Sequence, residues 1–488
     1  MKKYNKMFQR ITLLLAMGMF VTSCEKFTNG VSEFDPTLPR DASLDQVMNS
    51  SEVAYVGFVE GELTRIAGMW SGQFTGVDRQ YVSLDNYVST APDYDNGWSL
   101  LYAGALKSLK IAERKATELN NRKALGLAQV LEIHTMLSAT SMFGDVPYTQ
   151  MYNVTEFPNP AFDSQKSIYT ALLALADQAI ANISSGTGSF AGDYFGVSDA
   201  SALGAAYTLK AKMHLNLGEY QNALDAANSG LAAGDDLVSP HFGNYNLDMN
   251  IYYSFLVQDR PGYMGAKNSH SASMLDPANV GEAYNMNNAS TDESDRFAFI
   301  YTKTGGVYDL NTWDSETVKK VALFSPDASF PLITYRENVL IQAEAALRLG
   351  NFDDALASLN EYRDYLNEGG YVTADYSIKG NYQPFAAVDF NSGGIQNADG
   401  LAKEDALYRS IIAEKYVSMI GTLDTFVDLH RKGFGSFSGK QNWEVIGLKP
   451  TTGSNIPQRL LIAQSEINTN TSTPRPSPGL FDNTEVFK

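Results

Sequence analysis

The sequence predicts a mostly α-helical protein that combines tetratricopeptide-like helix pairs with a large irregular lobe. Two observations favour the helices. A helix–turn–helix segment occurs twice in altered form, and apolar residues recur at helical spacing through most of residues 99–233. A third observation indicates the lobe: the helical period is lost from Ser239 to Pro331, and about 90 residues are too many for one connecting loop in a compact domain.

The repeated segment is the most specific feature of the helical part. Met213–Leu224 and Ala345–Leu356 match when Gly218 is placed on Gly350. The match superposes Leu217 on Leu349, Tyr220 on Phe352, Ala223 on Ala355 and Leu224 on Leu356. Glycine takes the left-handed conformation that ends a first helix, and alanine lets two helix backbones approach closely. The pattern predicts two tetratricopeptide-like units, although two unrelated helical hairpins with the same Leu-Gly turn would also produce it.

Further helices are predicted along the chain from the spacing of apolar residues. The predicted helices are Ser43–Asn49, Val53–Ile66, Ser99–Leu119, Leu125–Met142, Ser164–Ile183, Ser201–Leu217, Asn222–Ala233, Pro331–Leu349, Asp353–Asn367, Asp405–Met419 and Leu423–Arg431. Ser164 suits the N-cap position of its helix. The tetratricopeptide-like helices are therefore expected at about residues 99–233, 331–367 and 405–431.

Three stretches without a helical period are expected to form the irregular lobe, at about residues 67–97, 239–330 and 369–399. They are rich in tyrosine, tryptophan, asparagine and glycine, as in Tyr284–Asn288. Short runs such as Phe297–Tyr301 resemble strands. Because binding residues concentrate on loops that a rigid scaffold holds in place, the ligand site is expected in this lobe.

The N-terminus has the pattern of a signal peptide, which we place at residues 1–23. Basic residues precede the apolar run Ile11–Val21, which is too short to span a bilayer. Cys24 is the only cysteine and follows small residues, as in a bacterial lipobox. We therefore predict that Cys24 carries a diacylglyceryl group and an acyl chain such as palmitate, which together anchor the protein to a membrane. The alternative is an ordinary cleavage site with a chance cysteine.

The predicted domain organisation follows from this pattern. Residues 24–42 form a lipidated tether, and residues 43–488 form a single body. The chain has 488 residues, of which 44% are hydrophobic and 19% charged, so that it can bury a large core. Its formal net charge of −18 argues against a nucleic-acid partner, because phosphates are bound by lysine and arginine.

No catalytic or metal-binding constellation is evident in the sequence. The five histidines do not form a His-Glu-x-x-His motif, and one cysteine cannot form a Cys-x-x-Cys motif. Asp292, Glu293 and Asp295 form an acidic cluster without a partner at a fixed spacing. Glu344 and Glu414 lie among apolar residues of predicted helices and are expected to be buried ion-pair or capping partners. We therefore expect a non-enzyme with no metal and no cofactor.

Six blocks of the sequence form a specific combination. They are the lipobox at Cys24, Phe143–Tyr148, Thr334–Glu337 with Glu344-Ala345, Ile411–Tyr416, Phe426–Arg431, and Pro457–Leu460 with Glu466 and Asn468. Together they resemble the SusD/RagB family of outer-membrane nutrient-binding lipoproteins of Bacteroidetes. The resemblance covers nearly the whole chain. Each block alone is a weak signal, but their combination is specific.

The resemblance implies a right-handed superhelix of four tetratricopeptide-like helix pairs with the irregular lobe packed on it. It also implies a lipid-anchored protein of the outer membrane, facing the cell surface, whose partner is a SusC-like TonB-dependent transporter. The sequence departs mildly from the family at Glu414-Lys415, and Glu25 is the only acidic residue directly after Cys24. The acidic signal for export to the cell surface is therefore short.

Ligand residues do not follow from the resemblance and were predicted from physical chemistry. Sugars pack their C–H faces on aromatic rings, and their hydroxyls bond to Asn, Asp and Arg. Two stretches supply both kinds of residue, Trp70–Tyr87 and Tyr284–Trp313. The predicted ligand residues are Trp70, Asp78, Arg79, Tyr81, Asn86, Tyr301 and Trp313. For each of them a packing role is the alternative, and Trp98 is interpreted as a core residue.

The leading hypothesis from the sequence is a non-catalytic protein that binds oligosaccharides and passes them to a transporter. A peptide-binding protein of the same architecture is the first alternative. A surface glycosidase or protease would need a pair of carboxylates or a metal in a cleft. A helical scaffold for protein partners is disfavoured because the aromatic residues concentrate outside the predicted helices.

Overall fold

The computed structural model describes residues 42–244, 248–313 and 319–487. The chain divides into two units, Met1–Ser43 and Leu44–Lys488. The predicted signal peptide, Cys24 and the tether up to residue 41 lie outside the described residues. In the described part of the chain, no helix is both long enough and apolar enough to cross a bilayer.

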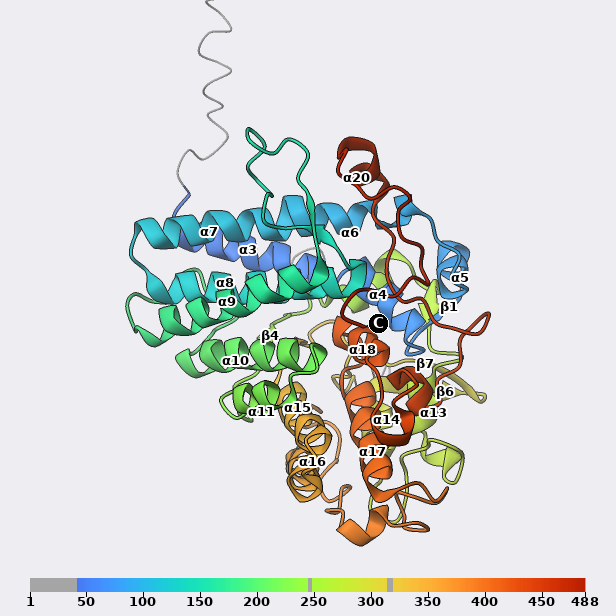
Figure 1. Ribbon diagram of the computed structural model, residues 1–488. Coiled ribbons are helices and arrows are strands. Elements are labelled where there is room, and N and C mark those ends of the chain that lie inside the picture. Colours follow the sequence, from blue (N-terminus) through green and yellow to red (C-terminus); the bar gives the residue numbers. More distant parts are fainter. Residues whose placement is uncertain (1–41, 245–247, 314–318, 488) are drawn as a thin grey trace, which may run out of the picture. The chain divides into compact units, whose positions relative to one another are not determined.

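Within residues 44–488 the fold is mostly α-helical, as predicted, and its long helices pack side by side (Figure 1). These helices are α3 (Leu44–Val59), α7 (Lys107–Glu118), α8 (Arg122–Phe143), α9 (Gln165–Ser184), α10 (Asp199–Asn216), α11 (Tyr220–Ala227), α15 (Tyr335–Arg348), α16 (Phe352–Asn367), α17 (Lys403–Ser418) and α18 (Leu423–His430). From α7 to α11 each helix packs against the next in sequence, and α11 then packs against α15.

The repeated segment forms two helix pairs of the predicted kind, α10 with α11 and α15 with α16. Gly218 and Gly350 stand in the two turns with φ angles of 76° and 86°, in the left-handed region. A residue with a Cβ is strained in this conformation, so glycine is the residue that each turn requires. The two pairs are neighbours through the packing of α11 on α15.

Some predicted boundaries differ from those in the structure. The predicted break between Asn49 and Val53 is absent, because α3 is continuous there; the second predicted helix instead breaks after Val59, and a separate helix α4 (Glu62–Trp70) begins after Gly61. The strand-like run Phe297–Tyr301 lies mostly in a helix, α14 (Ser294–Ile300). Four apolar residues in a row fit a buried helix turn as well as a strand, and Arg296 in the same turn is completely buried.

The remaining elements are short. The short helices are α5 (Arg79–Asp85), α6 (Asp95–Ser99), α12 (Ile251–Tyr253), α13 (His270–Leu275), α19 (Asn442–Val445) and α20 (Gln464–Thr469). The strands form four antiparallel pairs: β1 (Thr75–Gly76) with β5 (Met264–Gly265), β2 (Val146–Pro147) with β3 (Phe162–Asp163), β4 (Leu237–Ser239) with β8 (Phe330–Ile333), and β6 (Tyr301–Thr304) with β7 (Val307–Leu310).

The pair β4–β8 joins the two ends of the longest irregular stretch. Leu237 lies opposite Ile333, and Ser239 lies opposite Phe330. The chain therefore leaves the helical layer after α11 and returns to the same place before α15. Residues 240–329 form an insertion between two helix pairs that pack directly on each other.

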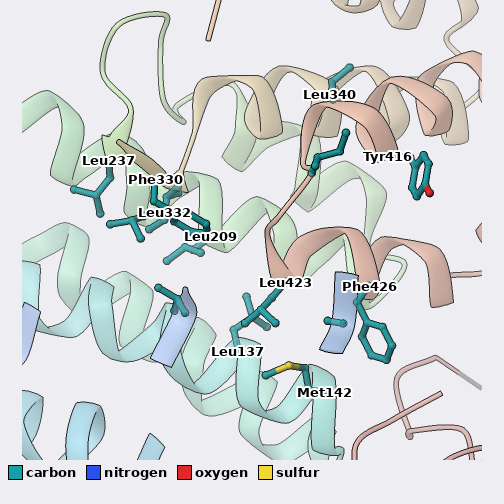
Figure 2. Packing of buried hydrophobic residues seen from close by; sticks show 14 of the residues in the cluster. Leu137, Met142, Leu209, Leu237, Phe330, Leu332, Leu340, Tyr416, Leu423 and Phe426 are labelled. Atoms are coloured by element: carbon teal, nitrogen blue, oxygen red, sulfur yellow. The ribbon is translucent and has the colours of Figure 1, made fainter. Parts of the chain in front are cut away.

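One buried cluster connects the helical layer with this insertion (Figure 2). Leu209 of α10 lies beside Phe330 and Leu332 of β8 (Figure 2). The labelled side chains of α8, α15, α17 and α18 are also almost fully buried. At about 25 cal/mol per Å² of apolar surface, such burial is the dominant favourable term in the stability of the fold.

A buried carboxylate, Glu344 of α15, connects three helices. Its oxygens lie 2.6 Å from both terminal nitrogens of Arg431, 3.1 Å from Nζ of Lys415 and 3.0 Å from Nε of Arg348. Asp428 of α18 is a second acceptor for Lys415 and Arg431. Glu344 is completely buried, so its charge is compensated by these cations. This arrangement confirms that Glu344 is an ion-pair partner.

We expect Gly350→Ala to lower the free energy of unfolding by about 1–2 kcal/mol, because alanine is strained at a φ of 86°. An added Cβ would touch nothing within 4 Å, so strain is the only cost. Gly439→Ala is the matched control, since that glycine also has open space and does not have a positive φ. Urea unfolding measures both, and equal stabilities would contradict the role given to Gly350.

We expect Glu344→Gln to lower the free energy of unfolding by about 3–5 kcal/mol, because three cations in a buried site lose the negative charge that they share. Glu118→Gln is the control, since Glu118 and Arg114 form an exposed ion pair at 3.8 Å. Loss of this exposed pair costs less than about 1 kcal/mol. A similar small loss for both variants would contradict the connecting role of Glu344.

The effect of Glu344→Gln is expected to depend on pH. Burial alone would raise the pKa of Glu344, but Arg431, Lys415 and Arg348 outweigh it and hold the pKa well below its usual value of 4.5. A carboxylate with a lowered pKa stabilises the fold above its unfolded pKa, and this contribution is lost as the pH falls through the folded value. The difference between wild type and variant should therefore decrease below pH values of about 4.

Candidate ligand-binding cleft

The irregular lobe and the helical layer enclose a cleft with a volume of about 520 Å³. Most of the lining comes from four segments: residues 280–291 of the insertion, α16, the segment 385–399 and α17; Met274 of α13 and Ile446 complete it. Hereafter "the cleft" means this cavity. A volume of this size is typical of sites for small molecules, which combine an apolar surface with a few fixed polar groups.

Tyr284 is the exposed aromatic residue of the cleft. Its side chain is 41% exposed, which is unusual for a large ring beside a cavity. Its φ angle of 66° lies in the left-handed region, where a bulky residue is a genuine outlier. The ring lies against the backbone of Gly447, where an added Cβ would come within 2.1 Å of it. Strain of this kind often marks ligand clamps, so Tyr284 is the first candidate for a ligand contact.

The loop behind Tyr284 is held by its own amide side chains. Asn285 Nδ2 donates to the carbonyls of Ser273 at 2.9 Å and Asp276 at 3.0 Å. Asn287 Nδ2 donates to the carbonyl of Leu275 at 3.1 Å, and its Oδ1 accepts from the backbone N–H of Glu293 at 2.8 Å. These amides are occupied within the protein. They fix the loop to α13 in advance of ligand binding, which reduces the entropy cost of binding.

Arg363 of α16 connects the walls of the cleft. Its Nη2 donates to the carbonyls of Ser290 and Gln383, both at 2.6 Å, and to Thr291 Oγ1 at 3.1 Å. Its guanidinium lies 3.6 Å from the ring centroid of Phe385. Burial lowers the pKa of Arg363 from its usual value. The residue therefore joins α16, the loop 284–291 and the segment that contains Gln383.

Glu414 lies in the wall of the cleft but is already paired. Nη1 of Arg296 lies 3.0 Å from Glu414 Oε2, and Nη2 lies 2.6 Å from Glu293 Oε1. Tyr382 donates to Glu293 at 2.8 Å. Burial raises the pKa of Glu293, although Arg296 opposes this effect. The expectation that Glu414 is a buried ion-pair partner is confirmed.

The rim of the cleft carries a second ion pair. Arg409 donates two hydrogen bonds to Asp399, at 2.6 and 2.8 Å. These hydrogen bonds lower the pKa of Asp399 from its usual value. Ser410 Oγ donates to Gln396 Oε1 at 3.1 Å, which positions the Gln396 amide at the rim. Planar charged and amide groups of this kind can bond to neighbouring hydroxyls of a ligand.

The structure places three of the predicted ligand residues in the core. Trp70 is 1% exposed, and its Nε1 donates to the carbonyl of Leu84 at 2.8 Å. Tyr81 is 2% exposed. Tyr301 is 1% exposed and shares a hydrogen bond with Ser271 Oγ at 2.6 Å. Each ring has a packing role, and none presents a face that a ligand from solvent can reach. Trp98, interpreted as a core residue, is also buried.

Three other predicted residues lie at the ends of α5. Asp78 is the N-cap residue and accepts from the backbone N–H of Arg79 at 2.9 Å. Asn86 is the C-cap residue, and its Nδ2 donates to the carbonyl of Val82 at 2.8 Å. The Arg79 guanidinium lies 5.5 Å from the ring centroid of Tyr263. All three predicted residues are exposed, and their role in ligand binding stays a prediction.

Trp313, the last predicted residue, is half-buried, with Lys319 Nζ 5.7 Å from its ring. None of the seven predicted residues lines the cleft. Sequence reasoning missed Tyr284, Arg363, Asp399 and Arg409. The composition of Tyr284–Asn288 gave a signal for Tyr284. Nothing in the sequence distinguished Arg363 and Arg409 from other arginines on helices.

Among the described residues, no group of three or more His, Cys, Asp or Glu side chains is arranged to hold a metal ion. The cleft itself offers an exposed ring, hydrogen-bonding groups and paired charges.

The comparison with protein families gives one match. Residues 48–445 match the SusD-like family that is described as starch-binding and associating with the outer membrane. This range includes all the helices from α7 to α18 and all four lining segments of the cleft. The chain belongs to this family. The resemblance inferred from the sequence is thereby confirmed. No curated protein matches the chain significantly.

Solved structures of the SusD-like family have the same fold. A SusD-like protein from Bacteroides thetaiotaomicron superposes with a TM-score of 0.64 at 16% identity, covering 90% of this chain and 98% of that one. A SusD homologue from Bacteroides fragilis gives 0.62 at 16%, covering 92% and 100%. A chitin-binding SusD homologue from Flavobacterium johnsoniae gives 0.58 at 14%, covering 87% and 94%. At these identities the likeness shows the fold alone.

Two residues of the cleft, Arg363 and Tyr284, should differ in how much they contribute to the stability of the fold. We expect Arg363→Met to lower the free energy of unfolding by about 2 kcal/mol, because the part-buried hydrogen bonds to Ser290, Gln383 and Thr291 are lost together. Tyr284→Asn should change it by less than about 1 kcal/mol, because asparagine tolerates a positive φ better than tyrosine. Urea unfolding of both variants tests this division, and the reverse order of stabilities would contradict it.

Proposed function

We propose that the protein is a non-catalytic lipoprotein of the outer-membrane surface that captures a glycan in the cleft. It then delivers the glycan to a SusC-like TonB-dependent transporter. Membership of a family described as starch-binding and associating with the outer membrane supports the class of ligand and the location. The chitin-binding relative from Flavobacterium johnsoniae supports a saccharide ligand as well.

The observation that carries this proposal is the position of Tyr284. A strained, 41% exposed aromatic ring lies beside a cavity of about 520 Å³. An open aromatic face is the surface on which the C–H groups of a sugar pack. The Asp399–Arg409 pair and Gln396 add hydrogen-bonding groups at the rim. This combination fits a hydroxyl-rich ligand with one apolar face.

The charges of the cleft support binding without catalysis. Hydrolysis of a glycosidic bond needs two carboxyl groups that flank the bond and act as acid and base or nucleophile. Glu414 is bonded to Arg296, and Asp399 is bonded to Arg409. The third acidic residue of the lining, Glu282, is exposed and stands without a second free carboxylate among the described lining residues.

The membrane anchor in this proposal is Cys24. Lipidation at this position would attach the body through the tether to the outer membrane, facing outward. The cysteine follows an apolar run with basic residues before it, as lipoprotein signal peptides require. Delivery to a transporter fits a binding protein that holds its ligand outside the membrane.

The proposal is tested with the soluble protein that lacks residues 1–24. Calorimetric titration with starch and chitin oligosaccharides and with a protein digest identifies the ligand class, and a parallel assay detects released product. We expect one glycan to bind without product formation. Tyr284→Ala should weaken this binding by at least about tenfold, which corresponds to about 1.4 kcal/mol.

Tyr152→Ala is the matched control for this substitution. Tyr152 is 42% exposed and has a φ of 64°, almost the same values as Tyr284, but it does not line the cleft. It should leave the affinity unchanged. Equal losses of glycan affinity in Tyr284→Ala and Tyr152→Ala would contradict binding of the glycan in the cleft. Binding only to the digest would favour the peptide alternative, and release of product would contradict a non-catalytic role.

A further inference from the structure

A second feature concerns the charge of α7 and the start of α8. Six basic residues and only two acidic ones lie between residues 107 and 123, although the whole chain has a formal charge of −18. The basic residues are Lys107, Lys110, Arg114, Lys115, Arg122 and Lys123. A concentration of positive charge on an acidic protein creates a local field that attracts anions.

Three of these basic residues, Lys110, Arg114 and Arg122, line a polar cavity of about 570 Å³ between α7, α8 and α9. Among the described residues, the ion-pair partner of Arg114 is Glu118, at 3.8 Å, and both side chains are exposed. Arg122 has no carboxylate within 4 Å in the part of the chain that the structure describes. The cavity is therefore lined by cationic side chains that their neighbours neutralise only in part.

The floor of this cavity is a chain of hydrogen bonds. Arg122 Nη1 donates to Asn182 Oδ1 at 2.8 Å, and Asn182 Nδ2 donates to Gln129 Oε1 at 2.7 Å. Gln129 is 5% exposed and lines the cavity. The three side chains are thereby held in place before a ligand binds, which reduces the entropy cost of binding.

The acidic residue of the lining is paired with Lys110. Lys110 Nζ lies 2.5 Å from Glu132 Oε2 and 3.2 Å from Glu113 Oε2. Burial and the neighbouring Glu132 raise the pKa of Glu113, and Lys110 opposes this effect. A raised pKa reduces the negative charge that Glu113 presents to an anion.

We propose that this cavity is a second ligand site, separate from the cleft, which binds a sugar that carries a phosphate or carboxylate group. Arg122 and Arg114 hold the anionic group, because a guanidinium forms paired hydrogen bonds with such oxygens. The amides of Gln129 and Asn182 face the sugar hydroxyls. A volume of about 570 Å³ exceeds the size of an inorganic ion and has room for a sugar ring.

The test is calorimetric titration of the soluble protein with glucose 6-phosphate, glucuronate and glucose at low and high salt. We expect at least one of the two anionic sugars to bind at least about tenfold more tightly than glucose. Its affinity should fall at high salt, because exposed charges are screened. Arg122→Gln should weaken the binding by at least about tenfold. Equal binding of all three sugars, or of wild type and variant, would overturn the proposal.

Two control variants keep this site distinct from the cleft. Arg475→Gln removes an exposed arginine that does not line the cavity and should leave the affinity unchanged. Tyr284→Ala should also leave it unchanged, even if glycan binding in the cleft is lost. Gln129→Met removes an amide of the lining without removing charge and should weaken the binding of the anionic sugar and of glucose alike. A loss of anionic-sugar binding with Arg475→Gln would show that only the net charge matters and would overturn the proposal.

A final measurement distinguishes the source of the anionic sugar. Vesicles that contain lipopolysaccharide carry phosphorylated sugars at a membrane surface, whereas glucose 6-phosphate is free in solution. Vesicle binding that Arg122→Gln abolishes would support a membrane-held ligand. Binding of the soluble sugar alone would support a free ligand. If neither the vesicles nor the soluble sugar binds, the proposal is overturned.

Discussion

The ion cluster around Glu344 is the constraint on which much of the structure depends. A single buried carboxylate accepts hydrogen bonds from Arg348 of its own helix, Lys415 of α17 and Arg431 at the end of α18. Removal of Glu344 would leave its cationic partners buried with less compensation, which favours one relative arrangement of the three helices. Because α17 also carries Arg409 and Glu414, the same cluster sets the position of one wall of the cleft.

The cleft combines rigid walls with an exposed ring. Arg363 ties the insertion to α16, and Arg296 ties it to Glu414 of α17. The amides of Asn285 and Asn287 fix the loop internally. Ligand binding then requires little ordering of the protein, and the binding energy can come from Tyr284 and the groups of the rim. This arrangement is consistent with a protein that captures a ligand in a site formed in advance.

Most of the long helices, the repeat and the buried acidic residues could be predicted from the sequence, because these features depend on local patterns. The Leu-Gly turns at Gly218 and Gly350 have a fixed backbone requirement, and Glu344 and Glu414 lie among apolar residues of helices. Ligand contacts were harder to predict. Trp70 and Tyr301 come from stretches rich in aromatics, as does Tyr284, but only the tertiary packing decides which ring is buried and which is exposed. Arg363 and Arg409 reach the cleft from helices that gave no functional signal.

The pairing of β4 with β8 has a consequence for how such a protein can change during evolution. The two strands bring the ends of residues 240–329 together at the surface of the helical layer, and α11 packs directly on α15. The closure entropy of a loop grows only slowly with its length, so exposed loops of the insertion can lengthen or shorten at a small cost in free energy. The packing of α11 on α15 does not depend on them. One helical body can therefore carry many different surface loops without a new fold.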